Sequence, residues 1–580
     1  MHFLLEMLIR DFIKPFWLPI LIIIVLTFGQ VIADLLLPNY MADIVDNGIA
    51  QGNISLILHT GGIMLIVAFL GIICAIGAGY LASKSALGVG RNLRKSLFEH
   101  VSGFSLNEFD QIGTSSLITR TTNDVQQIQQ TTFMVLRMMM RAPLMCIGGI
   151  IMAVQKDGDL SLLLLTILPF IGGVVYIVTV KAVPLFRQVQ KKIDQLNLVL
   201  RETLVGIRII RAFSRLGFEK RRFQAANEDL TLTSIKVNRI MAILNPSMNF
   251  CMNLLTIAII WFASFRIDKG NLMVGDMMAF IQYATQIFMS LTMITMMFVM
   301  LPRAFASAER IREVFNLKSD IADPMHPTII NQGLKGKINF KNVTFRYNDA
   351  EKAAVDNVSF KASPGETVAI IGGTGSGKTA LINLIPRYYD VENGKVEIDG
   401  IDVRDLKQEE LRDIIGLVPQ KITVFSGTIN ENIRMGKQDA SEEEIVHACQ
   451  VSQADEFIQN LPHKYETEVA QGGTNFSGGQ KQRLSIARAV VRRPRIYIFD
   501  DSFSALDFKT DAAVRSALHK ETEDATVIIV AQRITSIMNA DKILVLDNGK
   551  LVGEGTHEEL MESNKVYREI AASQLSEEEL

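Results

Sequence analysis

Cysteine is scarce in this chain, which has 4 cysteines in 580 residues, all widely spaced. No two of them form a Cys-x-x-Cys pair, so the common spacing of zinc sites and redox motifs is missing. Cys74, Cys146 and Cys251 fall in apolar segments. We therefore expect neither a disulfide framework nor a zinc site.

An excess of charge of either sign is also missing. Lys and Arg total 59 and Asp and Glu total 61, which gives a formal net charge of -2. A nucleic-acid-binding protein carries a basic patch or stripe, and this balance points to none. We therefore expect no nucleic acid partner.

Long apolar runs are abundant, and most of them lie before about residue 302. Hydrophobic residues make up 48% of the chain, and the mean hydropathy is +0.23, which is high for a soluble protein. Crossing the hydrocarbon core takes about 20 apolar residues. Six segments qualify: Phe16–Pro38, Leu56–Ala82, Phe133–Gln155, Leu160–Val183, Ile243–Phe265 and Met273–Met300. The sequence thus predicts an all-α, multi-pass transmembrane domain over residues 1–318, embedded in the bilayer of a bacterial cell membrane.

The links between these six segments are unequal in length. Two links, of about 50 and about 60 residues, are charged and helical in pattern, and the others are short. The short link Asn39–Ser55 contains no Lys or Arg, whereas both long links are rich in them. The positive-inside rule therefore places the long links and both chain termini in the cytoplasm. We expect helical extensions that turn near Phe109–Ser115 and Leu204–Phe213, where mixed apolar and polar tips are suited to docking on a second domain.

Polar and methionine residues recur inside the predicted spans, with helical spacing. They are Asn245, Asn249, Asn253, Gln282, Gln286, Met289, Met293, Met297 and Met300. Two interpretations remain open: a permissive cavity for amphipathic solutes, or hydrogen bonding and soft packing between helices. Asp34 lies near the predicted outer end of the first span, where both interfacial exposure and a role in gating or ligand binding remain open.

A linker rich in Asp, Pro and Gly over residues 319–335 leads to an α/β pattern over residues 336–580. There an apolar strand, Thr367–Ile371, precedes a glycine loop, and the loop precedes a helix that opens at Ala380. The loop matches the P-loop motif in full, with Gly372, Gly373, Thr374, Gly375, Ser376, Gly377, Lys378 and Thr379. Its backbone N–H groups and the helix N-terminus suit phosphate. We expect ATP as cofactor, with Lys378 on the β/γ-phosphates and the Thr379 hydroxyl on Mg²⁺.

Further motifs follow in order. Tyr347, after a predicted strand, is placed to stack on adenine. Gln420 follows another apolar strand and offers a side-chain carbonyl to Mg²⁺. Asp500 ends the apolar strand Arg495–Asp500, in the pattern of an acidic Mg²⁺ ligand. The other candidate residues are Ser477, Gly478, Gly479, Gln480, Asp501, Asp507 and Gln532.

In this order the motifs resemble those of the ATP-binding cassette (ABC) transporter family, and Ser-Gly-Gly-Gln is the family-specific element. Six spans ahead of one cassette resemble an exporter-type half-transporter. The resemblance implies that two cassettes dimerise head to tail, with each ATP between one chain's P-loop and the other chain's signature. Ser477 and Gly479 would then contact ATP bound to a partner, and Tyr347 would be the adenine-stacking aromatic.

Two positions depart from the family pattern. The residue after the acidic strand end is normally Glu, the general base, and here it is Asp501. Its carboxylate is displaced by about 1.5 Å, and a misplacement of that order costs about 10²-fold in rate. The switch residue is normally His, and here it is Gln532, which carries no charge. We therefore expect a hydrolysis-impaired site and a second half-transporter as partner, which resembles the degenerate-site subunit of bacterial heterodimeric multidrug exporters.

The predicted function is ATP-driven export of amphipathic or hydrophobic compounds by an ABC-type ATPase. A lipid or lipopeptide flippase, an ATP-gated channel and a regulator are the alternatives, because one fold hosts several functions.

Overall fold

The computed structural model describes residues 12, 14–328, 333–348 and 350–574. The chain divides into two compact units. One, the transmembrane unit, contains Met1–Val101 and Ser115–Asn316, and the other, the C-terminal unit, contains Ser102–Thr114 and Leu317–Leu580. The two ends of the chain, predicted to be cytoplasmic, lie outside the described residues.

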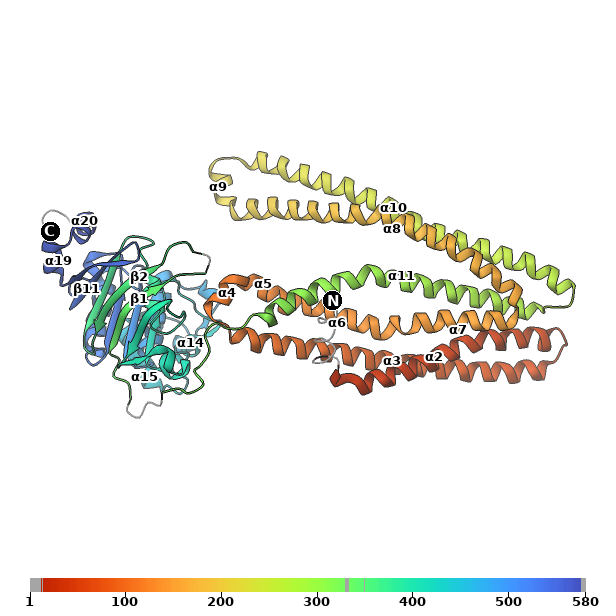
Figure 1. The fold of residues 1–580 in the computed structure, drawn as a ribbon, viewed down its shortest axis with the longest axis horizontal. Helices are drawn as coiled ribbons and strands as arrows, with labels where there is room; N and C mark the ends of the chain where they lie inside the picture. Colours follow the sequence, from red (N-terminus) through yellow and green to blue (C-terminus); the bar gives the residue numbers. More distant parts are fainter. Residues whose placement is uncertain (1–11, 13, 329–332, 349, 575–580) are drawn as a thin grey trace. The chain divides into compact units, whose positions relative to one another are not determined.

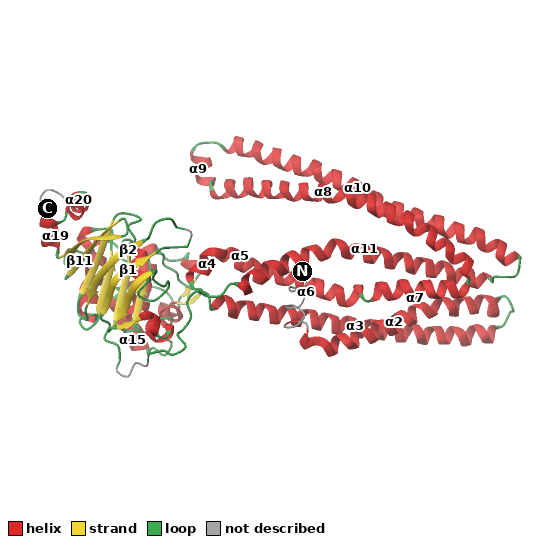
Figure 2. Ribbon diagram, viewed as in Figure 1, coloured by secondary structure: helices red, strands yellow, loops and turns green. Residues whose placement is uncertain are grey.

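The transmembrane unit is all helical (Figures 1 and 2). Its main helices are α2 (Trp17–Asp43), α3 (Ile54–Ser102), α5 (Thr114–Thr119), α6 (Val125–Met134), α7 (Arg141–Lys156), α8 (Gly158–Val205), α9 (Ile207–Ala212), α10 (Leu216–Asp268) and α11 (Val274–Asn316). A 3₁₀ turn, η2 (Lys14–Phe16), precedes α2, and short π-helical turns follow α2, α5 and α6: η3 (Ile44–Ile49), η4 (Arg120–Asp124) and η5 (Val135–Met139).

Six helical stretches of the described residues are long and apolar enough to cross a membrane, which confirms the predicted number of spans. Helices suit this environment because each satisfies its own backbone hydrogen bonds. The helices α3, α8 and α10 have 49, 48 and 53 residues. At about 1.5 Å per residue each is over twice as long as the roughly 30 Å hydrocarbon core. The predicted helical extensions are thereby confirmed.

Short helices occupy both predicted tips. The first is α4 (Leu106–Ile112), which begins with a capping box between Ser105 and Glu108. The second is α9, which joins the long helices α8 and α10, and these two run side by side in Figure 1. Arg222 donates to Glu202 at 2.6 Å between them, close to the α9 end. Both tips are thus ordered turns of helix.

Polar side chains of α11 attach it to α2 inside the transmembrane unit. Tyr283 Oη donates to the carbonyl of Leu35 at 2.9 Å, and Gln286 Nε2 donates to the carbonyl of Asp34 at 3.1 Å. Gln282 Nε2 contacts the Met41 sulfur at 3.2 Å. For the two glutamines, these contacts favour the interpretation as bonds between helices. Asn249, Asn253 and Met289 are exposed, and the side chains of Asn245, Met297 and Met300 are outside those described.

The C-terminal unit is built on sheets (Figure 2). A six-stranded sheet has the order β12-β11-β3-β10-β9-β6, and it is parallel except for β12. Its strands are β12 (Lys550–Gly555), β11 (Lys542–Asp547), β3 (Thr367–Gly372), β10 (Thr526–Val530), β9 (Ile496–Asp500) and β6 (Ile415–Val418). A four-stranded antiparallel sheet contains β2 (Val355–Ala362), β1 (Ile338–Phe345), β4 (Asn393–Ile398) and β5 (Ile401–Asp402), and a small ribbon pairs β7 (Gly427–Thr428) with β8 (Glu468–Val469).

Helices pack around these sheets. They are α12 (Lys378–Asn383), α13 (Gln408–Asp413), α14 (Ile429–Arg434), α15 (Glu442–Val451), α16 (Asp455–Gln459), α17 (Gly478–Val490), α18 (Phe508–Glu521), α19 (His557–Ser563) and α20 (Lys565–Ala572). Short 3₁₀ turns complete the unit: η6 (Val403–Asp405), η7 (Lys464–Glu466), η8 (Gln471–Gly473) and η9 (Ile534–Ser536). The strand β9 contributes to two hydrophobic cores, because its consecutive residues Ile498 and Phe499 point to opposite faces and belong to different cores. Since both its faces are buried, this strand is a near-continuous apolar run.

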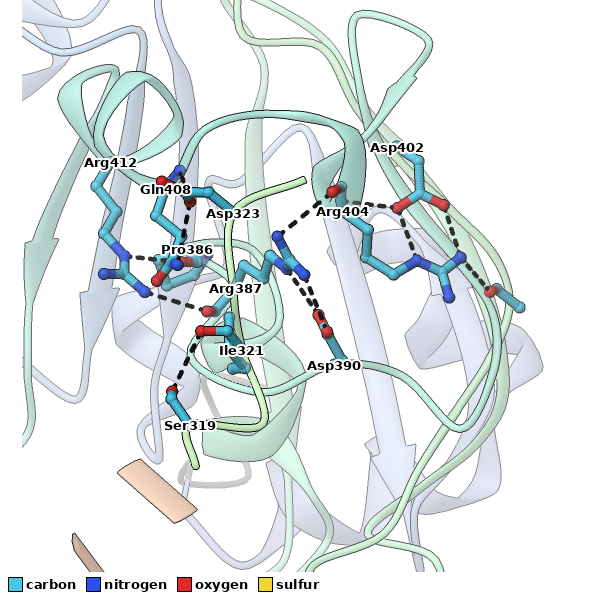
Figure 3. Close-up of polar contacts among 11 residues, drawn as sticks. Ser319, Ile321, Asp323, Pro386, Arg387, Asp390, Asp402, Arg404, Gln408 and Arg412 are labelled. Carbon is cyan, nitrogen blue, oxygen red and sulfur yellow. Dashed lines mark hydrogen bonds and ion pairs between the residues drawn. The ribbon is translucent and has the colours of Figure 1, made fainter. Parts of the chain in front are cut away.

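The segment that enters the C-terminal unit, within the predicted linker 319–335, is held by side chains (Figure 3). Asp323 accepts hydrogen bonds from the backbone N–H of Gln408 at 3.0 Å and from its Nε2 at 3.1 Å. Beside it, Arg387 forms a two-pronged pair with Asp390, at 2.8 and 3.1 Å. Asp323 therefore fastens the described part of the linker to the first residue of α13.

A buried carboxylate joins β1 to β4. Glu397 accepts hydrogen bonds from Lys341 and Asn339 at 2.8 Å each, and it pairs with Lys395 at 2.5 Å. Because these donors favour the ionised form, they hold the pKa of the Glu397 carboxyl down at about 2.

We expect Glu397→Gln to lower the thermal unfolding midpoint of the C-terminal unit by several degrees at pH 7. A depressed pKa stabilises the fold above the unfolded value of about 4.3, and this stabilisation is lost as the pH falls toward 2. The gap between wild type and variant should therefore shrink below about pH 4.5. Thermal unfolding of the full chain from pH 7 to 4 measures this. Glu392→Gln, at an exposed pair with Arg346, is the control, and an equal shift there would contradict the assignment.

Candidate functional site

A glycine loop leaves the carboxyl end of β3 and enters α12 at Lys378. Gly375 has φ +80° and Gly377 has φ +99°, in the left-handed region that favours glycine. A Cβ on Gly377 would lie 2.1 Å from the carbonyl oxygen of Ala354, whereas a Cβ on Gly375 would meet nothing within 4 Å. The loop is thus closely packed at Gly377 and open at Gly375.

The Lys378 ammonium lies over the loop itself. It donates to the carbonyls of Gly372 and Gly373 at 2.8 Å each. Burial lowers the pKa of Lys378, and the neighbouring carboxylates of Asp500 and Asp501 oppose that shift. The ammonium is therefore held by two neutral carbonyl acceptors, next to the open side of the loop at Gly375. An anion bound there would be a stronger partner for it.

Oxygen donors converge at the carboxyl end of β9, next to the loop. Thr379 Oγ1 donates to Asp500 Oδ2 at 3.2 Å, and burial raises the pKa of Asp500. Among the described residues, no group of three or more His, Cys, Asp or Glu forms a metal cage. A hydroxyl and one carboxylate suit Mg²⁺, which is bound by one or two carboxylates together with substrate phosphates.

Asp501 is the next residue, and its backbone has φ +47°. Its Oδ2 accepts from Gln532 Nε2 at 3.0 Å and from Gln420 Nε2 at 3.4 Å. Burial raises the pKa of Asp501, and the Gln420 hydrogen bond opposes the rise. The carboxylate borders an open cleft of about 500 Å³ lined by Asp501, Ser504, Gln532, Arg533, Thr535 and Gln574. The structure thus brings together the P-loop, Gln420, Asp500, Asp501 and Gln532.

Comparison with known families decides what kind of protein carries this site. The family described as the ABC transporter transmembrane region matches residues 20–291, and the family described as ABC transporter matches residues 355–504. The chain belongs to the ABC transporter family. This ABC transporter carries its membrane region and its ATPase domain on one chain, which is the arrangement of an exporter-type half-transporter.

Relatives of this ABC transporter align over nearly their whole length. An uncharacterized ABC transporter ATP-binding protein of Mycobacterium tuberculosis is 44% identical over 570 residues, 98% of each chain. A Bacillus subtilis protein named for multidrug export as an ATP-binding/permease protein is 31% identical over 567 residues, 97% of each chain. The structure of a bacterial Atm1-family ABC exporter with ATP bound is 25% identical, with a TM-score of 0.79, covering 97% of this chain and 99% of that one. The expected family and fold are confirmed, and the chain is a multi-pass membrane protein with an ATPase domain.

The Ser-Gly-Gly-Gln element of the ABC transporter begins helix α17. Ser477 is the N-cap, and its Oγ accepts from the backbone N–H of Gln480 while the Gln480 side chain accepts from the Ser477 N–H. Ser477 and Gly478 are exposed. Among the described residues, no hydrogen bond joins 477–480 to the P-loop. The capping box between Ser477 and Gln480 thus fixes the conformation of the Ser-Gly-Gly-Gln element, and its first two residues are accessible.

Asp507 is the N-cap of α18, where it accepts from the backbone N–H of Thr510 at 3.0 Å. That hydrogen bond lowers the pKa of Asp507. Asp507 thus has a structural role at a helix start, beside the signature rather than inside the P-loop cluster.

Tyr347 follows β1 and is 37% exposed. Its ring packs edge-on against Tyr389, with centroids 5.4 Å apart. Tyr389 in turn donates to Asp110 of α4 at 3.5 Å. Both tyrosines line a cavity of about 190 Å³ together with residues of α4's flank and the linker, so Tyr347 stands at a cleft rather than on an open face.

Several residues that position the site carry no motif of their own. Gln482 accepts from the Ala505 N–H at 3.1 Å and donates to the Asp501 carbonyl at 3.4 Å, which joins α17 to the turn after β9. Gln574 donates to the Gln532 carbonyl at 2.8 Å. A polar residue buried at 2% exposure, such as Gln482, has no signature in a polar helix. Only the fold identifies these two.

We expect Gly377→Ala to abolish ATP binding, because its Cβ cannot fit against the Ala354 carbonyl without moving the loop. Gly375→Ala is the matched control, since it has the same left-handed strain, about 1–2 kcal/mol, but open space around the Cβ. Titration of full-length chain with a fluorescent ATP analogue measures both. Equal affinities in the two variants would contradict the steric assignment.

Proposed function

We propose that this chain is one half of a heterodimeric ATP-driven exporter of amphipathic or hydrophobic compounds. Its own site binds ATP with Mg²⁺ but hydrolyses it poorly, and its signature completes the catalytic site of a second half-transporter. In this proposal residues 1–318 form the transmembrane domain, 319–335 the linker, and 336–580 a cytoplasmic ATP-binding domain.

The residues of the P-loop fit a nucleotide. Gly372 to Thr379 would surround the phosphates, and Lys378 would exchange its two carbonyl contacts for phosphate oxygens. Thr379, Gln420 and Asp500 would hold the magnesium ion. Tyr347 would hold the adenine ring by stacking, next to Tyr389. The bound nucleotide supplies the phosphoanhydride bond whose cleavage resets the transporter.

The observation that carries the proposal of an impaired site is the environment of Asp501. A general base must reach the proton that it abstracts, within about 2.6–3.2 Å or through one water. The Asp501 carboxylate is short and one of its oxygens already accepts from two amides, Gln532 and Gln420. Gln532 lacks the positive charge that a histidine at the switch position can place near a γ-phosphate. Both changes favour binding without efficient cleavage.

Two surfaces support a partner chain. The signature at Ser477 is accessible and preformed, so it can contact ATP bound to a partner chain. A homodimer would contain two impaired sites and would be a poor pump, so the partner is a different half-transporter. The tip around α9 also exposes large apolar side chains, with Val205 at 83%, Phe213 at 74% and Ile209 at 66%. Exposed apolar clusters mark interaction sites. A second half-transporter would cover this tip.

The class of substrate follows from one relative and from the residues of the membrane spans. One relative is named for multidrug export, and the spans carry methionine and polar residues, such as Met289, which is 56% exposed. Methionine repacks readily around different apolar ligands. An amphipathic or hydrophobic substrate is therefore the class we propose.

We expect the ATPase activity of the reconstituted pair to survive Asp501→Ala in this chain but to fall about 10²-fold or more when the partner's catalytic glutamate is replaced by glutamine. Steady-state ATP hydrolysis in nanodiscs measures both variants beside the wild type. Vigorous hydrolysis by this chain alone, lost in Asp501→Ala, would make Asp501 a working base and favour a homodimer.

A gain of function provides a second check. In a pair whose partner lacks its glutamate, Asp501→Glu combined with Gln532→His should raise hydrolysis by about 10²-fold, because the base regains its reach and the switch its charge. Each single substitution should restore less. If the double variant stays inactive while still binding ATP, the two departures do not explain the impairment.

A further inference from the structure

We propose that Arg137 and Arg141, inside the transmembrane unit, bind the anionic group of an amphipathic substrate. This inference rests on the proposed function as an exporter and names the charge of its substrate. Sequence reasoning did not single out these arginines, although two arginines four residues apart in an apolar span are a signal in themselves.

Both arginines lie away from the ends of the spans. Arg141 begins α7, which has 16 residues, so it stands about 22 Å along the helix axis from Lys156. Arg137 lies one turn earlier, in η5. Their contacts are on α2, which has 27 residues: Asp34 stands about 25 Å from Trp17 and about 14 Å from Asp43. The cluster is therefore at membrane depth and not at an interface.

The charges of this cluster do not balance. Arg141 pairs with Asp34 at 3.0 Å, and their side chains are 33% and 28% exposed. Arg137 donates to a neutral partner, Gln30 Oε1, at 3.4 Å. Among the residues described, Arg137 has no carboxylate within ion-pair distance. Two cations thus share one anion, so interfacial exposure alone does not describe Asp34.

Polar groups on neighbouring helices extend the cluster. Thr27, Gln30 and Asp34 follow each other at i, i+3 and i+7 and so share one face of α2. The Thr27 hydroxyl is 1% exposed and has no hydrogen-bond partner, and the Gln286 Oε1 atom is likewise unpartnered. An unsatisfied buried hydroxyl costs free energy unless a ligand pairs with it. This face of α2 therefore contains an unpaired hydroxyl donor one turn from Gln30, the residue that contacts Arg137.

The chemistry of the cluster selects an anion with an apolar body. An arginine inside a membrane span is costly, so an uncompensated arginine there marks a functional site. The guanidinium fork matches carboxylate, sulfate and phosphate groups with two parallel hydrogen bonds. Apolar side chains flank the cluster, among them Ile23 and Leu136, which are at most 6% exposed. Such a ligand is a soluble amphipathic anion or an anionic lipid.

The test uses 11-(dansylamino)undecanoic acid and its uncharged methyl ester as probes. Both are titrated without nucleotide into the full-length chain, alone and with its partner, in phosphatidylcholine nanodiscs. We expect Arg137→Gln to weaken binding of the acid at least about 10-fold, as for loss of a charge-assisted hydrogen bond, and to leave the ester unchanged. Arg137→Lys keeps the charge without the two parallel hydrogen bonds, so it should weaken binding of the acid less than Arg137→Gln does, and Asp34→Asn should raise the affinity. Arg221→Gln, an exposed arginine of α10, is the control and should change neither probe.

Equal binding of acid and ester to the wild type, or acid binding that survives Arg137→Gln, would overturn the proposal. Equal loss of both probes in the glutamine and lysine variants would also overturn it, since it would show a structural role. Phosphatidylglycerol added to the nanodiscs separates the two sources: competition with the acid assigns the site to a lipid headgroup, and no competition assigns it to a soluble amphiphile. Because no hydrolysis is needed, this result is independent of the ATPase assays that test the impaired site.

Discussion

Two neighbouring carboxylates at the buried end of β9 are the constraint around which the C-terminal unit arranges its site. Burial disfavours the charge of both Asp500 and Asp501, so their surroundings must supply donors or a cation. Thr379 supplies a hydroxyl to Asp500, whereas Gln420 and Gln532 supply amides to Asp501. The Lys378 ammonium contributes from the loop above. The P-loop, Gln420 and Gln532 therefore converge on these two side chains, whereas the signature and Tyr347 lie outside this cluster.

The transmembrane unit also contains charges that its surroundings disfavour, but these charges are positive. There, Arg137 and Arg141 stand at membrane depth in a medium that disfavours charge, and of these two only Arg141 has a carboxylate partner among the described residues. In both units an incompletely compensated charge marks the place where a ligand of the opposite sign would add most. Ligand binding at each place would relieve a cost that the folded chain already bears.

Local patterns made most of the fold predictable. Apolar runs of span length lead to α2 and α11, and the strand-loop-helix order around Lys378 leads to β3 and α12, because these features depend on neighbouring residues. Contacts between residues far apart in sequence were not predictable. Asp34 meets Arg141 only because two helices pack together, and no sequence pattern reports that pairing. By contrast, the grouping of α4 with the C-terminal unit agrees with the expectation that the mixed tip near Phe109–Ser115 docks on a second domain.

The last described residue of the chain, which follows α20, also contacts the loop after β10. Gln574 donates to the carbonyl of Gln532 and accepts from the N–H of Ile534, so it holds both sides of the switch loop. The loop beside Asp501 is thereby held by a side chain some forty residues further along the chain. Loss of the Gln574 amide would therefore release both of these contacts and free Gln532 to shift beside Asp501.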